Sequence, residues 1–75
     1  MKYSTKDIYF AAALLSHGYV LSSVDKNEVK HMIFIFEGVD SIRPIETEYL
    51  NKKLHVEISS FRDCLIRLKG IVHSS

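Results

Sequence analysis

The sequence has few of the residues from which common chemical sites are built. Its one cysteine, Cys64, cannot form an internal disulfide, so nothing in the composition argues for secretion. The three glycines, Gly18, Gly38 and Gly70, lie far apart, which excludes the closely spaced glycines of a phosphate-binding loop. No run approaches the ~18–20 apolar residues that a membrane span needs. These absences favour a soluble cytoplasmic protein that does not bind membranes.

Candidates for catalysis or metal binding are equally scarce. Cys64 falls on the apolar edge of a predicted helix, where a thiol is normally inert packing. Glu46 and Glu48 are two residues apart, so on a helix they do not face each other. Four histidines lack the short spacing of metal ligands on one helix: His17, His31, His55 and His73. We therefore expect no enzyme, with no catalytic residue, no metal and no cofactor.

Length and charge set further bounds. The 75 residues are 47% hydrophobic and 25% charged, which is typical of a folded chain rather than a disordered one. A chain of this length makes a single domain, residues 1–75, that buries only about 60–65% of the surface of its unfolded state. Its formal net charge of +1 is a poor basis for sequence-independent nucleic-acid binding, because such binding depends on many cationic contacts.

The five consecutive apolar residues 32–36 predict a strand. They are β-branched or aromatic and are followed by Glu37 and Gly38, which end the run. Because strand side chains alternate, the run divides into two sets. One face carries Met32, Phe34 and Phe36, and the other carries Ile33 and Ile35. Both faces need cover.

A helix is predicted over residues 4–17. Ser4 and Asp7 are spaced as a capping box at its start, and Gly18 supplies a left-handed stop at its end. Its apolar residues fall on two sides: Ile8, Ala11, Ala12 and Leu15 on one, Phe10 and Leu14 on nearly the opposite one. Such a helix is either central to the core or shared with another chain.

Residues 19–24 predict a strand that forms a hairpin with residues 29–36, through a polar turn at residues 25–28. If Val24 lies opposite Val29, one face of this two-stranded sheet is bulky and aromatic. The second face is thinner, and 75 residues are too few to cover both faces. We expect this exposed face to be a protein interface, together with the free edge of the sheet. Its predicted residues are Val20, Val24, His31, Ile33 and Ile35.

The second half of the chain predicts two helices. Pro44 suits the first turn of a short helix that runs to about Asn51. A second hairpin that turns at Asn51 and Lys52 fits residues 44–58 nearly as well, because apolar residues also alternate there. A final helix begins at Ser59 or Ser60 and frays or ends near Gly70, before a loose tail. Its apolar stripe consists of Phe61, Leu65, Leu68 and Val72.

These elements give an α+β domain in the order helix, strand, strand, short helix, helix. The exposed sheet face indicates a homodimer, or a surface that binds one protein partner. Charge suggests an alternative, because residues 52–75 hold five Lys or Arg against two Asp or Glu. A basic stripe could follow a phosphate backbone and make the chain a small nucleic-acid-binding module. Its residues are Lys52, Lys53, Arg62 and Lys69.

Several segments resemble one known family. They are residues 4–9 (STKDIY), 11–15 (AAALL) and 18–19 (GY), and later Tyr49-Leu50-Asn51 with the apolar positions that follow. The sequence is similar to short proteins of bacteria, phages and prophages that form a domain of unknown function. The resemblance implies a helix–hairpin–helix–helix order and a phage or mobile-element accessory protein, which could inhibit or regulate a host factor. It supplies no site residues. Where the family often has glycine after the asparagine, this chain has Lys52.

Overall fold

The apolar run of residues 32–36 lies in the central strand of a three-stranded antiparallel sheet. The computed structural model describes residues 1–28 and 31–73. Within them the order is β1 (Lys2–Thr5), α1 (Ile8–Ser16), β2 (Leu21–Glu28), β3 (His31–Glu37), α2 (Val39–Leu50) and α3 (Ile58–His73). The sheet order is β1-β3-β2. The predicted α+β class is confirmed.

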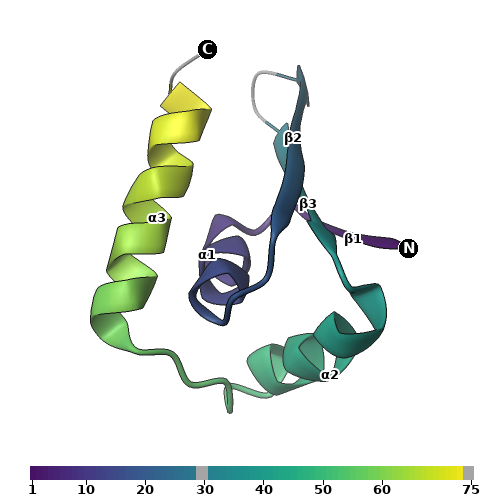
Figure 1. Ribbon diagram of the computed structural model, residues 1–75, viewed down its shortest axis with the longest axis vertical. Helices are drawn as coiled ribbons and strands as arrows, with labels where there is room; N and C mark the ends of the chain where they lie inside the picture. The colour runs from purple at the N-terminus through teal and green to yellow at the C-terminus, as the bar shows by residue number, and fades with distance from the viewer. Residues whose placement is uncertain (29–30, 74–75) are drawn as a thin grey trace.

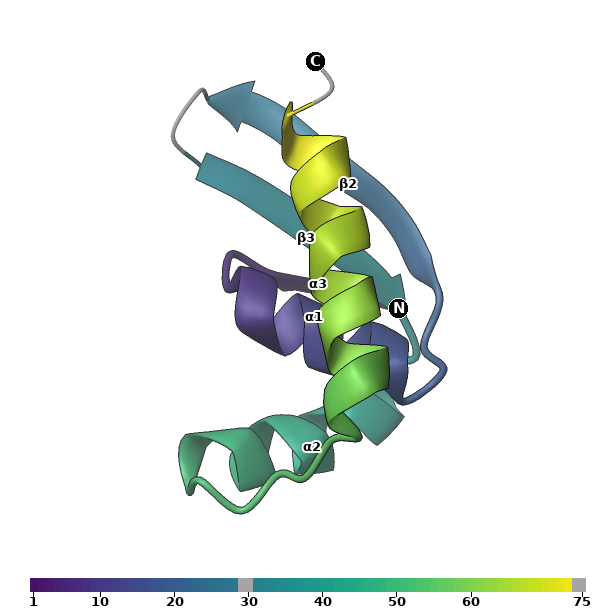
Figure 2. The same cartoon turned by 90° about the vertical axis from the view of Figure 1, so that its left-hand side faces the viewer.

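The helices lie on one side of the sheet or beneath it (Figure 1). α1 packs next to the sheet and α3 lies outside α1, while α2 crosses the lower end of the molecule (Figure 2). In the described residues, no helix covers the opposite side of the sheet. No described helix is both long enough and apolar enough to cross a membrane.

β1 was not predicted. Tyr3 pairs with Phe36 and Thr5 with Phe34, so β3 has a partner on both sides and is not a free edge. The predicted capping role of Ser4 is therefore wrong, and the helix begins at Ile8 rather than at residue 4. Asp7 is the N-cap, and its Oδ1 accepts hydrogen bonds from the backbone N–H groups two and three residues later, at 2.9 and 3.3 Å.

β2 is longer than predicted. Residues 25–28, predicted as a turn, belong to the strand, and residues 29–30, which the prediction placed in the partner strand, lie outside the described part. Val24 pairs with Phe34 instead of Val29. This shift by an odd number of residues moves Val24 to the helix-covered face, where it packs against the core, so its predicted place on the exposed face is wrong. The register also breaks between Leu21 and Ser23, as in a β-bulge.

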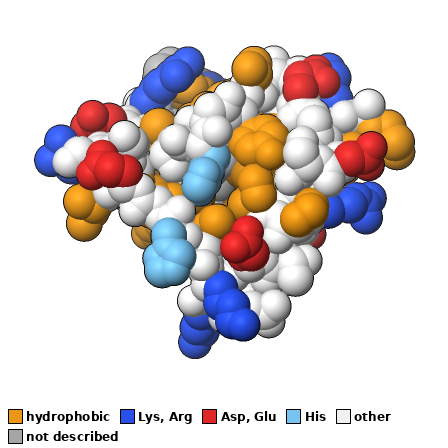
Figure 3. All heavy atoms as spheres, turned by 60° about the horizontal axis from the view of Figure 1, so that its bottom comes forward, with side chains coloured by type: hydrophobic (Ala, Val, Ile, Leu, Met, Phe, Trp, Pro, Cys, Tyr) orange, Lys and Arg blue, Asp and Glu red, His pale blue; other side chains and the backbone are white. Residues whose placement is uncertain are grey.

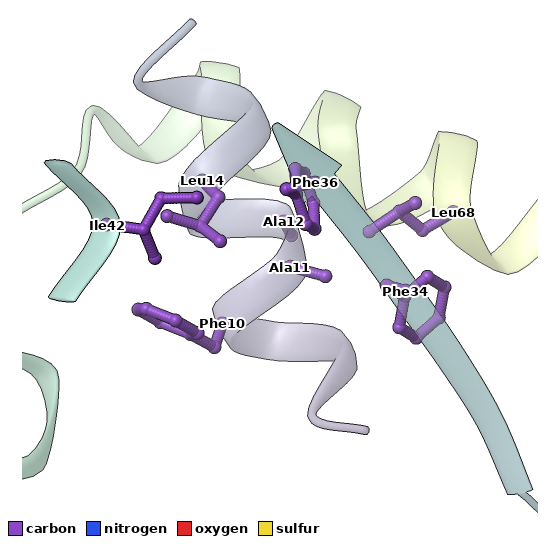
Figure 4. Close-up of a cluster of buried hydrophobic side chains, with 8 residues drawn as sticks. All are labelled: Phe10, Ala11, Ala12, Leu14, Phe34, Phe36, Ile42 and Leu68. Carbon is purple, nitrogen blue, oxygen red and sulfur yellow. The ribbon is translucent and has the colours of Figure 1, made fainter. Parts of the chain in front are cut away.

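The sequence predicted that α1 is either central to the core or shared with another chain. In the structure it is central to the core. Its buried residues fill both sides of the helix (Figure 4). Phe10 and Leu14 point toward Ile42 of α2, whereas Phe34 of β3 and Leu68 of α3 lie on the other side. The small side chains of residues 11–13 are all buried and allow neighbours to approach closely.

α2 begins at Val39, five residues before the predicted start. Gly38 adopts a left-handed conformation (φ 90°) that redirects the chain from β3 into the helix. Ile42 is fully buried and fixes the added turn against α1. Pro44 therefore lies inside the helix, at an exposed position. The predicted helix is confirmed over the alternative hairpin, because residues 51–57 form no strand.

α3 also differs at both ends from its prediction. Glu57 caps it, since its carboxylate accepts from the backbone N–H groups of Ser59 and Ser60 at 3.0 and 2.9 Å. These bonds hold the pKa of Glu57 below its ordinary value. The helix continues through Gly70 to His73, so the predicted end is wrong. The predicted apolar stripe is confirmed, because all four of its residues belong to the core or pack against it.

Candidate protein interface

The face predicted as an interface is only partly assembled. Ile33 and Ile35 alternate along β3 with the buried Phe34 and Phe36, so they lie on the side of the sheet away from the core, and both are partly exposed. Ile35 is opposite Ser4 on one side and Ser23 on the other, and Ile33 is opposite Asp25. Polar residues therefore border these two isoleucines, and the apolar surface of this face is narrow.

Val20 and Val24 do not join that pair. Val20 is 66% exposed but precedes β2, and Val24 lies on the covered face. The side chain of His31 lies outside the part of the chain that the structure describes. The sheet edges also discourage pairing, because β1 has four residues and β2 has two irregularities in register.

Another group of exposed aliphatic side chains lies where α2 leads into α3. Leu50 (72% exposed), Val56 (37%) and Ile58 (78%) come from the last turn of α2, the α2–α3 connection and the first turn of α3. We call these three residues the tip surface. The sequence pattern missed them, because alternation at residues 54, 56 and 58 was assigned to a possible strand. Figure 3 views this end of the molecule, where hydrophobic side chains reach the surface among charged groups and beside histidines.

The backbone of the tip is held in place by the rest of the fold. A ring nitrogen of His17, at the end of α1, hydrogen-bonds to the carbonyl oxygen of His55 at 3.1 Å. Leu54 packs against the core. The connection that carries Val56, between Leu50 and Ile58, is thus anchored to α1 and to the core.

The end of α2 has a defined capping geometry. Lys52 N–H donates to the carbonyl of Tyr49 at 3.0 Å, and Lys53 N–H donates to that of Glu48 at 2.8 Å, which is the Schellman pattern. Lys52 occupies the left-handed position (φ 60°) where glycine is normally preferred. The turn therefore forms in this chain with Lys52 at the position where the family often has glycine.

Opposite charges lie on the two helices that the tip connects. α2 contains Asp40, Glu46 and Glu48 against Arg43, a net charge of −2. α3 contains Arg62, Arg67 and Lys69 against Asp63, a net charge of +2. α2 extends to one side of the connection and α3 to the other (Figure 1).

The predicted basic residues are exposed but do not form one row. Arg62 and Lys69 lie on the solvent side of α3, with Ile66 between them at 61% exposure. Lys52 and Lys53 belong to the turn after α2. Arg62 is also partly neutralised, because its Nη2 lies 3.2 Å from Oδ1 of Asp63.

Two tyrosine–carboxylate pairs form the densest polar cluster in the described residues, and the sequence did not predict them. The Tyr3 hydroxyl donates to Glu46, and the Tyr49 hydroxyl donates to Oδ2 of Asp7 at 2.5 Å. Both rings contact Phe10, one edge-on at 5.9 Å between centroids and the other stacked at 4.8 Å. The cluster therefore joins β1, α1 and α2 around one buried ring.

The pKa values show that both phenols keep their protons at neutral pH. The hydrogen bond to Asp7, followed by burial, raises the pKa of Tyr49 to about 12. Burial, followed by the hydrogen bond to Glu46, raises the pKa of Tyr3 still further. Both side chains act as donors that fasten α2 to the rest of the domain.

No group of three His, Cys, Asp or Glu in residues 1–28 and 31–73 is arranged to hold a metal ion. Cys64 is partly buried and packs against the core, in the position that its helical spacing predicted.

Comparison with known protein families shows which family the chain belongs to. A family model described as "Domain of unknown function (DUF5659)" matches residues 1–74. The chain belongs to this family. The predicted resemblance to a domain of unknown function is thus confirmed, while the phage or prophage origin stays a prediction. Comparisons of this DUF5659 member with curated proteins and with solved structures found no match.

Proposed function

We propose that the protein is a non-enzymatic accessory protein that acts by binding another protein chain through the tip surface. The observation that supports this most is the exposure of Leu50 and Ile58, at 72% and 78%, at the two ends of a connection that is hydrogen-bonded to α1. A side chain of this kind gains about 1.5–3 kcal/mol when it is fully buried. Exposed apolar side chains mark a protein interface where they form a contiguous patch. The phage or mobile-element setting, with inhibition or regulation of a host factor, is part of this proposal.

Site-specific photo-crosslinking inside cells tests the proposal. A photoreactive amino acid is placed at Ile58, and the matched control places it at Tyr9, which is 54% exposed on α1. We expect a protein adduct of defined mass from position 58 and none from position 9. Equal adducts from both positions, or none from position 58, would contradict a protein interface at the tip.

Nucleic-acid binding is the second candidate, because Arg62 and Lys69 share the solvent side of α3. If it is correct, affinity for a labelled oligonucleotide falls steeply with added salt, since phosphate contacts release counterions. The double change Arg62→Glu and Lys69→Glu then abolishes binding, whereas Ile58→Asp leaves it unchanged. Weak binding that the charge reversal does not alter would remove this candidate.

A further inference from the structure

α2 contributes little to the packing among the other elements. β1 and β2 both pair with β3, and α1 packs closely against α3. α2 makes smaller contacts, with α1 and β1, and crosses the lower end of the molecule (Figure 2). The other five elements therefore hold together as one body, to which α2 is attached.

The later turns of α2 are held by partial burial and by two polar bonds. Its two buried residues both belong to its first turn, Val39 and Ile42. Beyond that turn, Glu46 accepts a hydrogen bond from Tyr3 of β1. Tyr49 donates one to Asp7 at the start of α1. We call these two hydrogen bonds the clasp, because they join the second half of α2 to the body.

The chain offers a hinge at each end of α2. Gly38 precedes the helix and, lacking a Cβ, changes its backbone angles at little steric cost. After the helix, Leu54 packs against the core and the carbonyl of His55 is hydrogen-bonded to His17. The second hinge is therefore confined to residues 51–53.

α2 has little helical stability of its own. It is 12 residues long, and isolated helices of this length are marginal in water. Pro44 also removes one hydrogen bond from its interior. When α2 leaves the body, its backbone amides therefore lose their helical hydrogen bonds and become open to exchange with water.

We infer that α2 opens as one unit between Gly38 and residues 51–53, under the control of the clasp, while the other elements stay folded. Opening uncovers Phe10 and Leu14, which are 2% and 0% exposed in the closed state and point toward α2 (Figure 4). The fold thus contains a device that hides or presents an apolar side of α1. This inference does not depend on the proposed function, because opening is measured without a partner.

Native-state hydrogen exchange, followed for each amide by NMR at low urea concentrations, measures this opening. We expect the most protected amides of residues 45–50 to exchange at least about tenfold faster than those of residues 33–36, after correction for intrinsic rates. Their exchange should also depend less on urea, because opening of α2 exposes less surface than global unfolding. Equal protection and equal urea dependence of the two segments would overturn the inference.

A substitution in the body separates opening from global unfolding. Leu68 lies across α1 from Ile42, so its contacts persist when α2 opens (Figure 4). Leu68→Val removes one buried methylene and speeds exchange in β3 by about two- to tenfold, whereas exchange in α2 stays unchanged. Acceleration of both segments by the same factor would mean that α2 opens only when the whole domain unfolds.

The clasp has a test of its own. Tyr49→Phe removes a hydrogen bond to a charged acceptor, so we expect exchange in α2 to become at least about tenfold faster. Tyr3→Phe acts in the same direction, because it removes the bond to Glu46. The matched control Tyr9→Phe removes an exposed hydroxyl from α1 and leaves exchange in α2 unchanged. If neither clasp variant speeds exchange in α2, control of the opening by the clasp is overturned.

Discussion

The core around α1 and the tip between α2 and α3 use the same kinds of residue in opposite ways. Leu14 of α1 is fully buried between elements, whereas Leu50 at the end of α2 is 72% exposed. Both belong to helices with ordered, hydrogen-bonded C-terminal ends. Fold stability therefore depends on the core, and the exposed aliphatic residues of the tip contribute little to it.

The largest expected effect comes from truncating one side chain in each of these two regions and comparing the loss of stability. Leu14→Ala leaves a cavity beside Ile42 and costs about 2–5 kcal/mol of unfolding free energy. Ile58→Ala, at a 78% exposed position, changes that free energy by less than about 0.5 kcal/mol. Urea unfolding measures the free energy of unfolding of both variants. Similar losses for the two variants would contradict the division between core and tip.

A smaller effect comes from the polar contact that fastens α2 to the core. Tyr49→Phe removes the hydrogen bond to Asp7 and costs about 1.5–3 kcal/mol, because the acceptor is charged. Tyr9→Phe, at an exposed position on α1, is the matched control and changes stability little. In a double-mutant cycle, Asp7→Asn and Tyr49→Phe are non-additive, since each removes the same interaction. Simple additivity would mean that the contact does not hold α2.

The same contact predicts how stability depends on pH. The pKa of Tyr49 is about 12 in the folded chain and 10.0 in an unperturbed tyrosine, so above pH 10 the unfolded chain loses its proton first. This contribution to stability is complete below pH 10 and is lost as the pH rises toward 12. The free energy of unfolding, measured with denaturant across this pH range, should fall less steeply for Tyr49→Phe than for the natural chain.

The smallest expected effect concerns the backbone of the tip. The end of α1 has Gly18 in the left-handed position (φ 92°), and the end of α2 has Lys52 there (φ 60°), with the same pair of hydrogen bonds. Lys52→Gly removes a cost of about 1–2 kcal/mol for a left-handed residue and adds chain entropy in the unfolded state. We expect a net gain of about 0.5–1 kcal/mol. Lys53→Gly, the control without positive φ, should not stabilise the chain.

Local sequence patterns were sufficient where neighbouring residues decide the structure. The apolar run of residues 32–36 gave β3, and the stripe from Phe61 to Val72 gave the buried side of α3. β1 was missed because Ser4 and Asp7 also fit a helix cap, and only pairing with β3 selects the strand. The register of Val24 was wrong because it depends on the full length of β2 and on its irregularities.

The candidate site shows the same limit. Ile33 and Ile35 were correctly predicted to lie on an uncovered face, but their polar neighbours come from strands whose pairing the sequence did not reveal. The alternation of apolar residues that includes Val56 and Ile58 indicated a possible strand. Only the packing of Leu54 inward, with Val56 and Ile58 left exposed, shows that these positions form a surface.

Photo-crosslinking in cells from position 58, with position 9 as the matched control, tests the proposed protein interface most directly. We expect a protein adduct of defined mass from position 58 and none from position 9. Equal adducts from both positions, or none from position 58, would contradict the proposal.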